Sequence, residues 1–202
     1  MRVEFAGHAL DVWPLAVIVM AGLLMILWRR KASYPYLLCV LIFSIYLLFA
    51  LDQTFFPIWI SGGYADSLRQ LPFTSRINLI PFYFGPFGTL ADSVETLVLN
   101  VALTIPFGFG VSFIWRIRRK TILWLALAIG LITEGGQLVI SLLLGYPYRE
   151  IDIDDVIMNA LGVLIGYGSF RLFVWVYRWM MKRSGIRRGG LIGYIEEIVN
   201  RV

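Results

Sequence analysis

Carboxyl and carboxamide side chains interrupt the most apolar stretches of this sequence, and they recur at helical spacing. In one stretch Glu134 and Gln137 share a stripe with Gly130 and Ser141, at intervals of 4, 3 and 4 residues. At 100° per residue these four positions fall within an arc of about 60°. A buried carboxyl group on such a stripe can transfer a proton or hold a polar ligand. Glu134 is therefore a candidate catalytic acid or base, and Gln137 a candidate binding residue.

A second stripe repeats the pattern about 20 residues later. It consists of Asp152, Asp155, Asn159, Gly162 and Gly166, at intervals of 3, 4, 3 and 4 residues, which keeps them within an arc of about 80°. The two aspartates are further catalytic candidates, and the asparagine is a binding candidate. The Gly-x-x-x-Gly step favours close packing against a neighbouring helix.

The depth of these groups gives an independent test of whether they can meet. Gln137 lies seven residues before Leu144, and Asn159 lies seven residues beyond Asp152, which places both roughly 10 Å below the outer surface at 1.5 Å per residue. Asn100, which shares a helix face with Thr104, reaches a similar level, and Glu134 lies about one turn deeper. Polar groups that face hydrocarbon are costly, so they face a bundle interior or a wet cavity. The sequence predicts one polar pocket between three helices, open towards the outer face.

Charged residues flank the open end of this predicted pocket. Arg149 stands among the acids of the corner 146–155, and Arg76 and Asn78 lie in an earlier segment. An arginine beside several carboxylates tends to pair with them, and its planar guanidinium can do so with two hydrogen bonds. Arg76, Asn78 and Arg149 are added to Asn100, Gln137 and Asn159 as binding candidates.

Each candidate also has a purely structural interpretation. Glu134 could hydrogen-bond to Gln137 or Asn100 and join helices, and Asp152 or Asp155 could favour the first turn of a helix. A divalent-cation site of Glu134 with these two aspartates is a further alternative. Since there is no cluster of His or Cys residues, we predict neither a metal site nor a cofactor. Nucleophile and phosphate-loop motifs are also missing, so enzyme activity stays open.

The elements that must position these residues are membrane-spanning helices. Of 202 residues, 59% are hydrophobic and 15% are charged, and the mean hydropathy is +0.76. Average soluble domains carry about 25% charged residues, so most of this single domain, residues 1–202, belongs in lipid. Five segments approach the length of about 17 to 25 residues that a span requires. These segments are 12–28, 34–51, 94–115, 122–144 and 155–177.

Basic residues set the expected orientation of the five spans. The links 29–33 and 116–121 and the tail 178–202, which fall on one side, hold 3, 4 and 6 Lys or Arg residues, whereas the opposite side holds 4. The positive-inside rule then predicts an outer N-terminus and a cytoplasmic C-terminus. Since the basic residues cluster between apolar runs, the orientation in the membrane accounts for the net charge of +5. We therefore expect no nucleic-acid partner.

Two further segments are neither spans nor simple loops. The proline- and aromatic-rich segment 52–92 contains an apolar core, 77–84, that is too short to span and too apolar for free solution, which predicts a re-entrant or interfacial outer segment. In the tail, Leu191, Ile195, Ile198 and Val202 recur at helical spacing. This spacing predicts an amphipathic helix on the cytoplasmic membrane surface.

Four blocks, in this order over about residues 76–168, resemble the VanZ-like family. They are Arg76-x-Asn78-Leu79-Ile80-Pro81-Phe82, Asn100 followed by Pro106-Phe107-Gly108, Glu134-x-x-Gln137, and Arg149-x-x-Asp152-x-x-Asp155-x-x-x-Asn159-x-x-Gly162.

The resemblance implies an all-α, multi-pass protein of the bacterial cell membrane. Its founding member lowers susceptibility to teicoplanin-type lipoglycopeptides, so the expected partners are membrane lipids and either such an antibiotic or a lipid-linked cell-wall precursor. Two functions follow as expectations. One is a resistance protein that engages the antibiotic through an outer pocket. The other is an intramembrane enzyme that acts on a lipid-linked cell-envelope substrate.

Overall fold

Long helices make up most of the chain in the computed structural model, which describes residues 8–83, 89–181 and 189–201. Four of them, α2 (Tyr34–Phe55), α4 (Leu90–Ile114), α5 (Arg119–Leu144) and α6 (Ile153–Met181), are long and apolar enough to cross a membrane. The helix α1 (Trp13–Arg29) is apolar but shorter, with 17 residues. The predicted all-α membrane class is confirmed, and the described spans run a few residues past most of the predicted ends.

Local sequence chemistry explains where several of these helices begin and end. Pro14 and Pro35 occupy the first turns of α1 and α2, where a missing N–H has no cost. The helix α4 begins with a capping box, in which Thr89 Oγ1 accepts a hydrogen bond from Asp92 N at 3.2 Å and Asp92 accepts one from Thr89 N at 2.8 Å. The helix α5 ends at Gly145, whose φ of +75° suits glycine.

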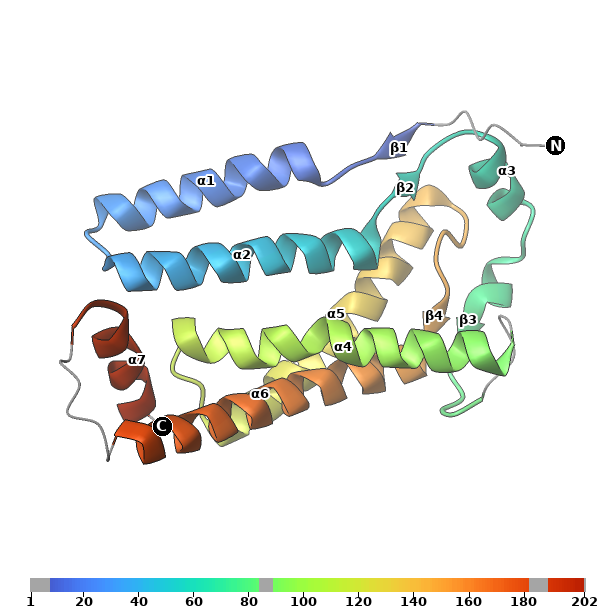
Figure 1. Cartoon of the computed structure of the whole chain (residues 1–202). Coiled ribbons are helices and arrows are strands. Elements are labelled where there is room, and N and C mark those ends of the chain that lie inside the picture. The colour runs from blue at the N-terminus through green and yellow to red at the C-terminus, as the bar shows by residue number, and fades with distance from the viewer. Residues whose placement is uncertain (1–7, 84–88, 182–188, 202) are drawn as a thin grey trace.

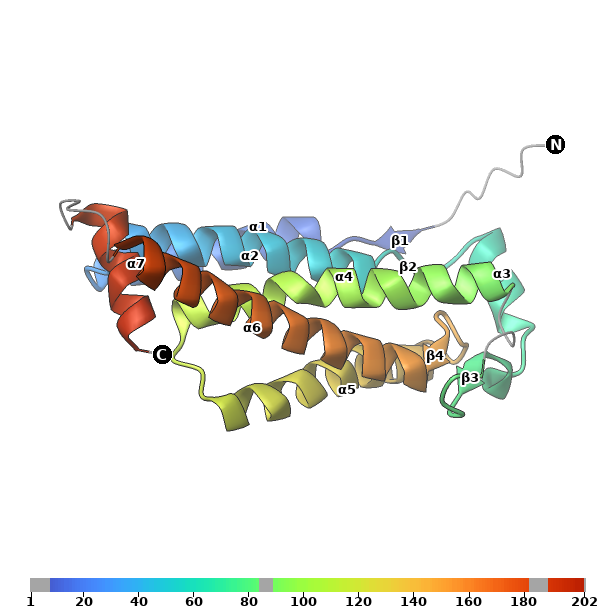
Figure 2. The ribbon, with the colours of Figure 1, turned by 60° about the horizontal axis from the view of Figure 1, so that its bottom comes forward.

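The helices form an elongated bundle with two different ends (Figures 1 and 2). Figure 1 shows the α1–α2 turn, the last turn of α4 and the short helix α7 (Gly190–Asn200) together at one end. The short strands and α3 (Gly63–Arg69) lie at the opposite end. The basic links 29–33 and 116–121 therefore share one end of the bundle, as five alternating helices require.

Glycines bring α6 directly against α4 and α5. A Cβ atom built on Gly166 would lie 2.0 Å from Ile105 O, and one on Gly108 would lie 2.0 Å from Val163 O. On α5, a Cβ atom on Gly130 would lie 2.4 Å from Val156 O. No side chain fits such gaps, so the close packing predicted from the Gly-x-x-x-Gly step of α6 is confirmed.

The described part of the segment 52–92 lies at the end of the bundle that carries the short strands (Figure 1). It forms β2 (Ile58–Trp59), α3, a 3₁₀ turn (Phe73–Arg76) and β3 (Ile77–Asn78). The strand β2 pairs antiparallel with β1 (Ala9–Leu10), and β3 pairs parallel with β4 (Ile151–Asp152). The turns between these elements divide the segment 52–92 into pieces that are too short to span a membrane. Phe84, the last residue of the predicted apolar core 77–84, lies outside the described residues.

The predicted C-terminal amphipathic helix is present as α7, but its apolar face contacts the protein. Tyr194, Ile198 and Val199 are buried in the same core as α4 and α6. Tyr194 Oη donates to Phe113 O at 2.5 Å, and Arg178 Nη2 donates to Val199 O at 2.7 Å. The predicted helix is therefore confirmed, its packing on the bundle is an addition to the prediction, and its place on the membrane surface stays a prediction. Val202, the last position of the predicted stripe, lies outside the described residues.

Candidate functional site

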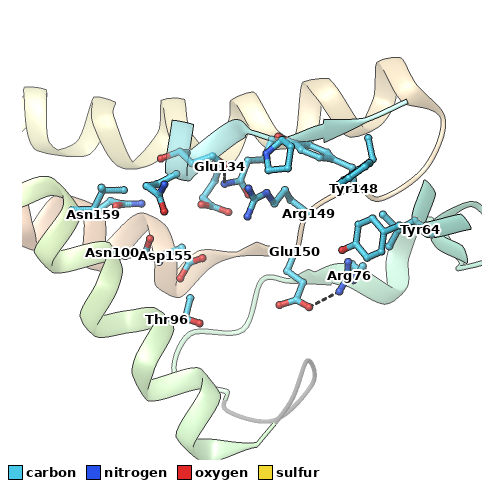
Figure 3. Close-up of a pocket in the computed structure, with 17 residues that line it drawn as sticks. Tyr64, Arg76, Thr96, Asn100, Glu134, Tyr148, Arg149, Glu150, Asp155 and Asn159 are labelled. Carbon is cyan, nitrogen blue, oxygen red and sulfur yellow. Dashed lines mark hydrogen bonds and ion pairs between the residues drawn. The ribbon is translucent and has the colours of Figure 1, made fainter. Parts of the chain in front are cut away.

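A cavity of about 470 Å³ lies where α2, α4, α5 and α6 meet the link between α5 and β4. It is lined by seven of the nine residues that the sequence singled out, namely Arg76, Asn100, Glu134, Gln137, Arg149, Asp155 and Asn159. Figure 3 shows Asn100 and Asn159 at one end of this pocket and Arg76 with Tyr64 at the other, with the carboxyl groups of Glu134 and Asp155 between them.

The helix α5 contributes two buried polar side chains to the pocket. Glu134 is 6% exposed, and its Oε2 accepts a hydrogen bond from Asp152 N at 3.2 Å. Gln137 Nε2 donates to Thr54 O on α2 at 3.2 Å. In its structural interpretation, Glu134 was predicted to bind Gln137 or Asn100. The structure corrects this, because the observed partner is the backbone N–H of Asp152, directly before α6. The second oxygen of Glu134 stays available to the pocket.

Two amides leave hydrogen-bonding capacity unused beside the acids. Asn159 is 3% exposed, and its Nδ2 donates to Thr133 Oγ1 at 3.2 Å. Asn159 Oδ1 and Asn100 Nδ2 are both buried and have no hydrogen-bond partner of ordinary geometry among the residues that the structure describes. Buried polar atoms in native proteins are nearly always satisfied, so these two atoms indicate a place for a ligand or water.

Charged residues at the mouth of the pocket are held by the link before β4. Arg76 Nη2 pairs with Glu150 Oε1 at 2.8 Å, and Arg149 Nη2 donates to Phe56 O at 2.8 Å. In the described part of the chain Arg149 forms no ion pair, which leaves donors free for a ligand. Burial raises the pKa of the Glu150 carboxyl group, while Arg76 offsets part of that rise. Burial also raises the pKa of Tyr148 to about 12, so this phenol is neutral at the pocket wall.

The other two predicted residues, Asn78 and Asp152, lie beside the pocket and bind each other. Asn78 Nδ2 donates to both carboxylate oxygens of Asp152, at 3.2 and 3.1 Å, and the same two residues are opposite one another in the β3–β4 ladder. Asp152 Oδ1 also accepts from Asp154 N at 2.9 Å. These contacts hold Asn78 and the start of α6 in position. The catalytic role of Asp152 stays a prediction.

Asp154 is a residue whose importance the sequence analysis did not recognise. It is 2% exposed, and its two carboxylate oxygens accept from Phe82 N at 2.9 and 3.0 Å. Phe82 has a φ of +58°, a conformation that is strained for a bulky residue. An acid at a helix start is visible in the sequence, but its partner 72 positions earlier is not.

Further pocket residues carry no sequence signal of their own. Tyr148, Glu150, Thr54 and Thr96 also line the cavity. Among the described residues there is no group of three His, Cys, Asp or Glu side chains placed to hold a metal ion. The alternative of a cation held by Glu134 with Asp152 and Asp155 is therefore not supported.

Comparison with known proteins gives one family match. The family model described as VanZ/LLP1 matches residues 43–174, more than half of the chain. The matched region runs from the middle of α2 to α6 and includes every residue that lines the pocket. Comparisons with curated proteins and with solved structures gave no match.

Proposed function

Because the chain belongs to the VanZ/LLP1 family, we propose that this multi-pass membrane protein lowers susceptibility to teicoplanin-type lipoglycopeptides through its polar pocket. The proposal places it in the bacterial cell membrane, with the pocket towards the outer face. Such an antibiotic combines polar groups with a fatty acyl chain. A binding protein for it needs a polar cavity beside an apolar surface.

The observation that carries the proposal is the pairing of these two surfaces at one end of the bundle. The pocket offers carboxylates, amides and the unpaired Arg149. Near it the outer segment ends in an apolar tip, in which Leu79, Ile80 and Phe82 are 68%, 64% and 60% exposed. We propose that the pocket engages one polar group of the drug and that the tip contacts its acyl chain or the adjoining lipid.

The experiment is to express the protein in a susceptible bacterium and to measure growth inhibition by teicoplanin and by vancomycin, which lacks the acyl chain. Expression should raise the inhibitory concentration of teicoplanin and leave that of vancomycin unchanged. Arg149→Gln should remove most of this protection, because it removes donors in the pocket. The matched control is Arg69→Gln, at an arginine on α3 that is 45% exposed. Equal susceptibility to teicoplanin with and without expression rejects the proposal.

A second candidate function is supported by the two acids in the pocket. Glu134 and Asp155 interact electrostatically across it, and such a pair can transfer a proton to or from a lipid-linked cell-envelope precursor. Glu134→Gln separates the candidates, because glutamine keeps the oxygen that accepts from Asp152 N. An enzyme should lose roughly a hundredfold or more in turnover of the precursor. A binding protein should keep part of its protection against teicoplanin.

A further inference from the structure

Three groups with acceptor oxygens converge in the part of the pocket that lies deepest in the bundle. Two are the carboxylates of Glu134 and Asp155, which form no ion pair within the described chain, and the third is Asn159 Oδ1. Figure 3 shows the three side chains on adjoining walls of the same cavity. A cavity with an excess of unpaired acceptors selects a ligand that brings positively charged donors.

The orientation of the Asn159 amide is fixed by its neighbours. The hydroxyl of Thr133 donates its hydrogen to Gly130 O at 2.8 Å, so its oxygen must accept from Asn159 Nδ2, which lies 3.2 Å away. The carbonyl oxygen of Asn159 therefore stays free, in a side chain that is only 3% exposed. A primary ammonium group carries three donors in a compact space, so it can donate one hydrogen bond to each of these three groups.

Next to these acceptors, Asn100 on α4 offers a hydrogen-bond donor. Asn100 Nδ2 is buried and has no partner of ordinary geometry in the parts of the chain that are described. It interacts with the Asp155 carboxyl group beside it, and because an amide nitrogen carries two donors it can also donate to an acceptor oxygen of a ligand. The pocket thus combines acceptors suited to an ammonium group with a donor suited to an oxygen beside it. A phosphate ester that carries a short amine has both.

A separate apolar groove of about 290 Å³ runs along the lipid-facing side of α2 and α4. It is lined by residues of the ranges 39–46 and 106–113. Ile42 on its edge is 59% exposed, so the groove opens sideways in the spanning region. Its walls offer aliphatic and aromatic side chains, which suit a hydrocarbon chain.

The groove and the pocket follow one seam between α2 and α4. Leu103 lines the pocket, and its carbonyl oxygen accepts from the hydroxyl of Tyr46, which lines the groove, at 2.7 Å. From Asn100 to Pro106, where the groove begins on α4, the helix rises about 9 Å. An acyl chain covers about 15 Å, half of a hydrocarbon core about 30 Å thick. A chain attached to a head group at Asn100 therefore reaches the groove.

We propose that the pocket and the groove together form a binding site for an aminophospholipid, a membrane lipid with a primary amine on its phosphate. The ammonium group lies among Glu134, Asp155 and Asn159, a phosphate oxygen accepts from Asn100, and one acyl chain follows the seam. The inference deepens the proposed function, on which it rests, by adding one class of membrane lipid to the ligands of the same pocket.

The test uses the full chain in lipid nanodiscs with photoreactive lipids. Phosphatidylethanolamine and phosphatidylglycerol, each with a diazirine near the end of one acyl chain, are crosslinked, and the labelled peptides are identified by mass spectrometry. Phosphatidylethanolamine should label residues 39–46 and 106–113 about tenfold more than phosphatidylglycerol, the size expected from hydrogen bonds to a charged group. Asp155→Asn and Glu134→Gln should each abolish this preference.

Groove variants separate binding along the seam from general contact with lipid. Ile42→Trp should remove labelling of the groove, whereas Leu123→Trp, at a residue of α5 that is 58% exposed, should not. Equal labelling by the two lipids, or a preference that survives both acid variants, overturns the inference. Teicoplanin protection measured in parallel keeps the two proposals distinct. Protection without a lipid preference rejects the inference alone, and a preference without protection rejects the proposed function alone.

Discussion

At the scale of single residues, the start of α6 organises the rim of the pocket. The side chain of Asp152 accepts from Asn78, its backbone N–H donates to Glu134, and the next acid, Asp154, accepts from Phe82 N. Each contact joins residues that are distant in sequence. These acids therefore determine where the outer segment sits relative to the pocket.

We expect Asp154→Ala to loosen the outer segment without unfolding the bundle. The change removes two short contacts to Phe82 N, and a lost hydrogen bond to a charged group costs about 1.5 to 3 kcal/mol. Phe82 would then leave its strained φ of +58°. Hydrogen–deuterium exchange of the peptide covering 77–83 should rise by at least tenfold, while that of α4 and α6 stays unchanged. Asp66→Ala, at an exposed ion pair on α3, is the control that should leave both regions unaffected.

The raised pKa of Glu150 gives a prediction for the pH dependence of stability. Glu150 binds a proton more readily in the folded chain than in the unfolded chain, because burial outweighs its pairing with Arg76. Its contribution is therefore most favourable below the ordinary glutamate pKa of about 4.3, and it is lost as the pH rises through the higher folded-state pKa. In detergent, the midpoint temperature of thermal unfolding, taken relative to that of Glu150→Gln, should decrease as the pH rises from 4 to 7. A difference that is constant or rises over this range contradicts the assignment.

The residue types of the pocket were predictable from the sequence, but their partners were not. Burial of polar groups in lipid is costly, and this single constraint identified Asn100, Glu134, Gln137 and Asn159 by periodicity and depth. The contacts of Asp154 and Arg149 cross 72 and 93 positions to backbone atoms of Phe82 and Phe56. Backbone partners carry no side-chain signature, so no pattern in one sequence indicates them.

At the scale of elements, the glycines of α6 determine how closely α4 approaches and thereby how wide the pocket is. Asn100 and Thr104 on α4 face α6 only because Gly162 and Gly166 have no side chain: a Cβ atom on Gly162 would lie 2.1 Å from Thr104 Oγ1. At Gly162 and Gly166 the backbone of α6 therefore lies against the backbone of α4, at Val101 O and Ile105 O. Small changes at these positions should move the wall of the pocket.

Gly166→Ala should destabilise the protein, whereas Gly168→Ala should not. The Cβ atom at position 166 would lie 2.0 Å from Ile105 O, and at position 168 no atom lies within 4 Å. Overpacking of this kind costs about 1 to 3 kcal/mol. The first variant should lower the midpoint of thermal unfolding in detergent and reduce lipid labelling. Equal midpoints for the two variants would show that the helices separate without cost.

The helices themselves were largely predictable, and the short outer elements were not. Hydropathy located α2, α4, α5 and α6 because lipid requires a fixed apolar length. The segment 52–92 holds two-residue strands, and β3 pairs with β4 across 74 positions. Two residues are too few to show a period. The helix α7 was predictable from its apolar spacing, but its contacts with the bundle were not, because an apolar stripe fits either lipid or protein.

At the scale of the whole molecule, the two ends of the bundle differ in chemistry. Figure 1 places the links 29–33 and 116–121 at the end opposite to the short strands, and these links hold seven of the 18 Lys and Arg residues. The polar pocket lies towards the end with the strands. From this difference the positive-inside rule predicts a pocket that faces outward, as the proposed function requires.

Cysteine accessibility in intact cells should test this orientation. In a Cys39→Ser background, Gln70→Cys near the pocket should react with a membrane-impermeant maleimide. Arg30→Cys at the opposite end should react only after the cells are opened. Both native side chains are exposed, so a lack of reaction reports the membrane and not burial. The reverse pattern would turn the pocket towards the cytoplasm and contradict the proposed role at the outer face.

The double role of Asp152 has a mechanical consequence. Its side chain holds Asn78 in the outer segment, and its backbone holds Glu134 inside the bundle, while α6 cannot slide past α4 where backbone meets backbone. A pull on the outer segment is therefore transmitted through one residue to a carboxylate on another helix. A ligand that docks on the exposed tip would therefore change the position of Glu134. A ligand that neutralises Glu134 would in turn change how firmly Asp152 holds the outer segment.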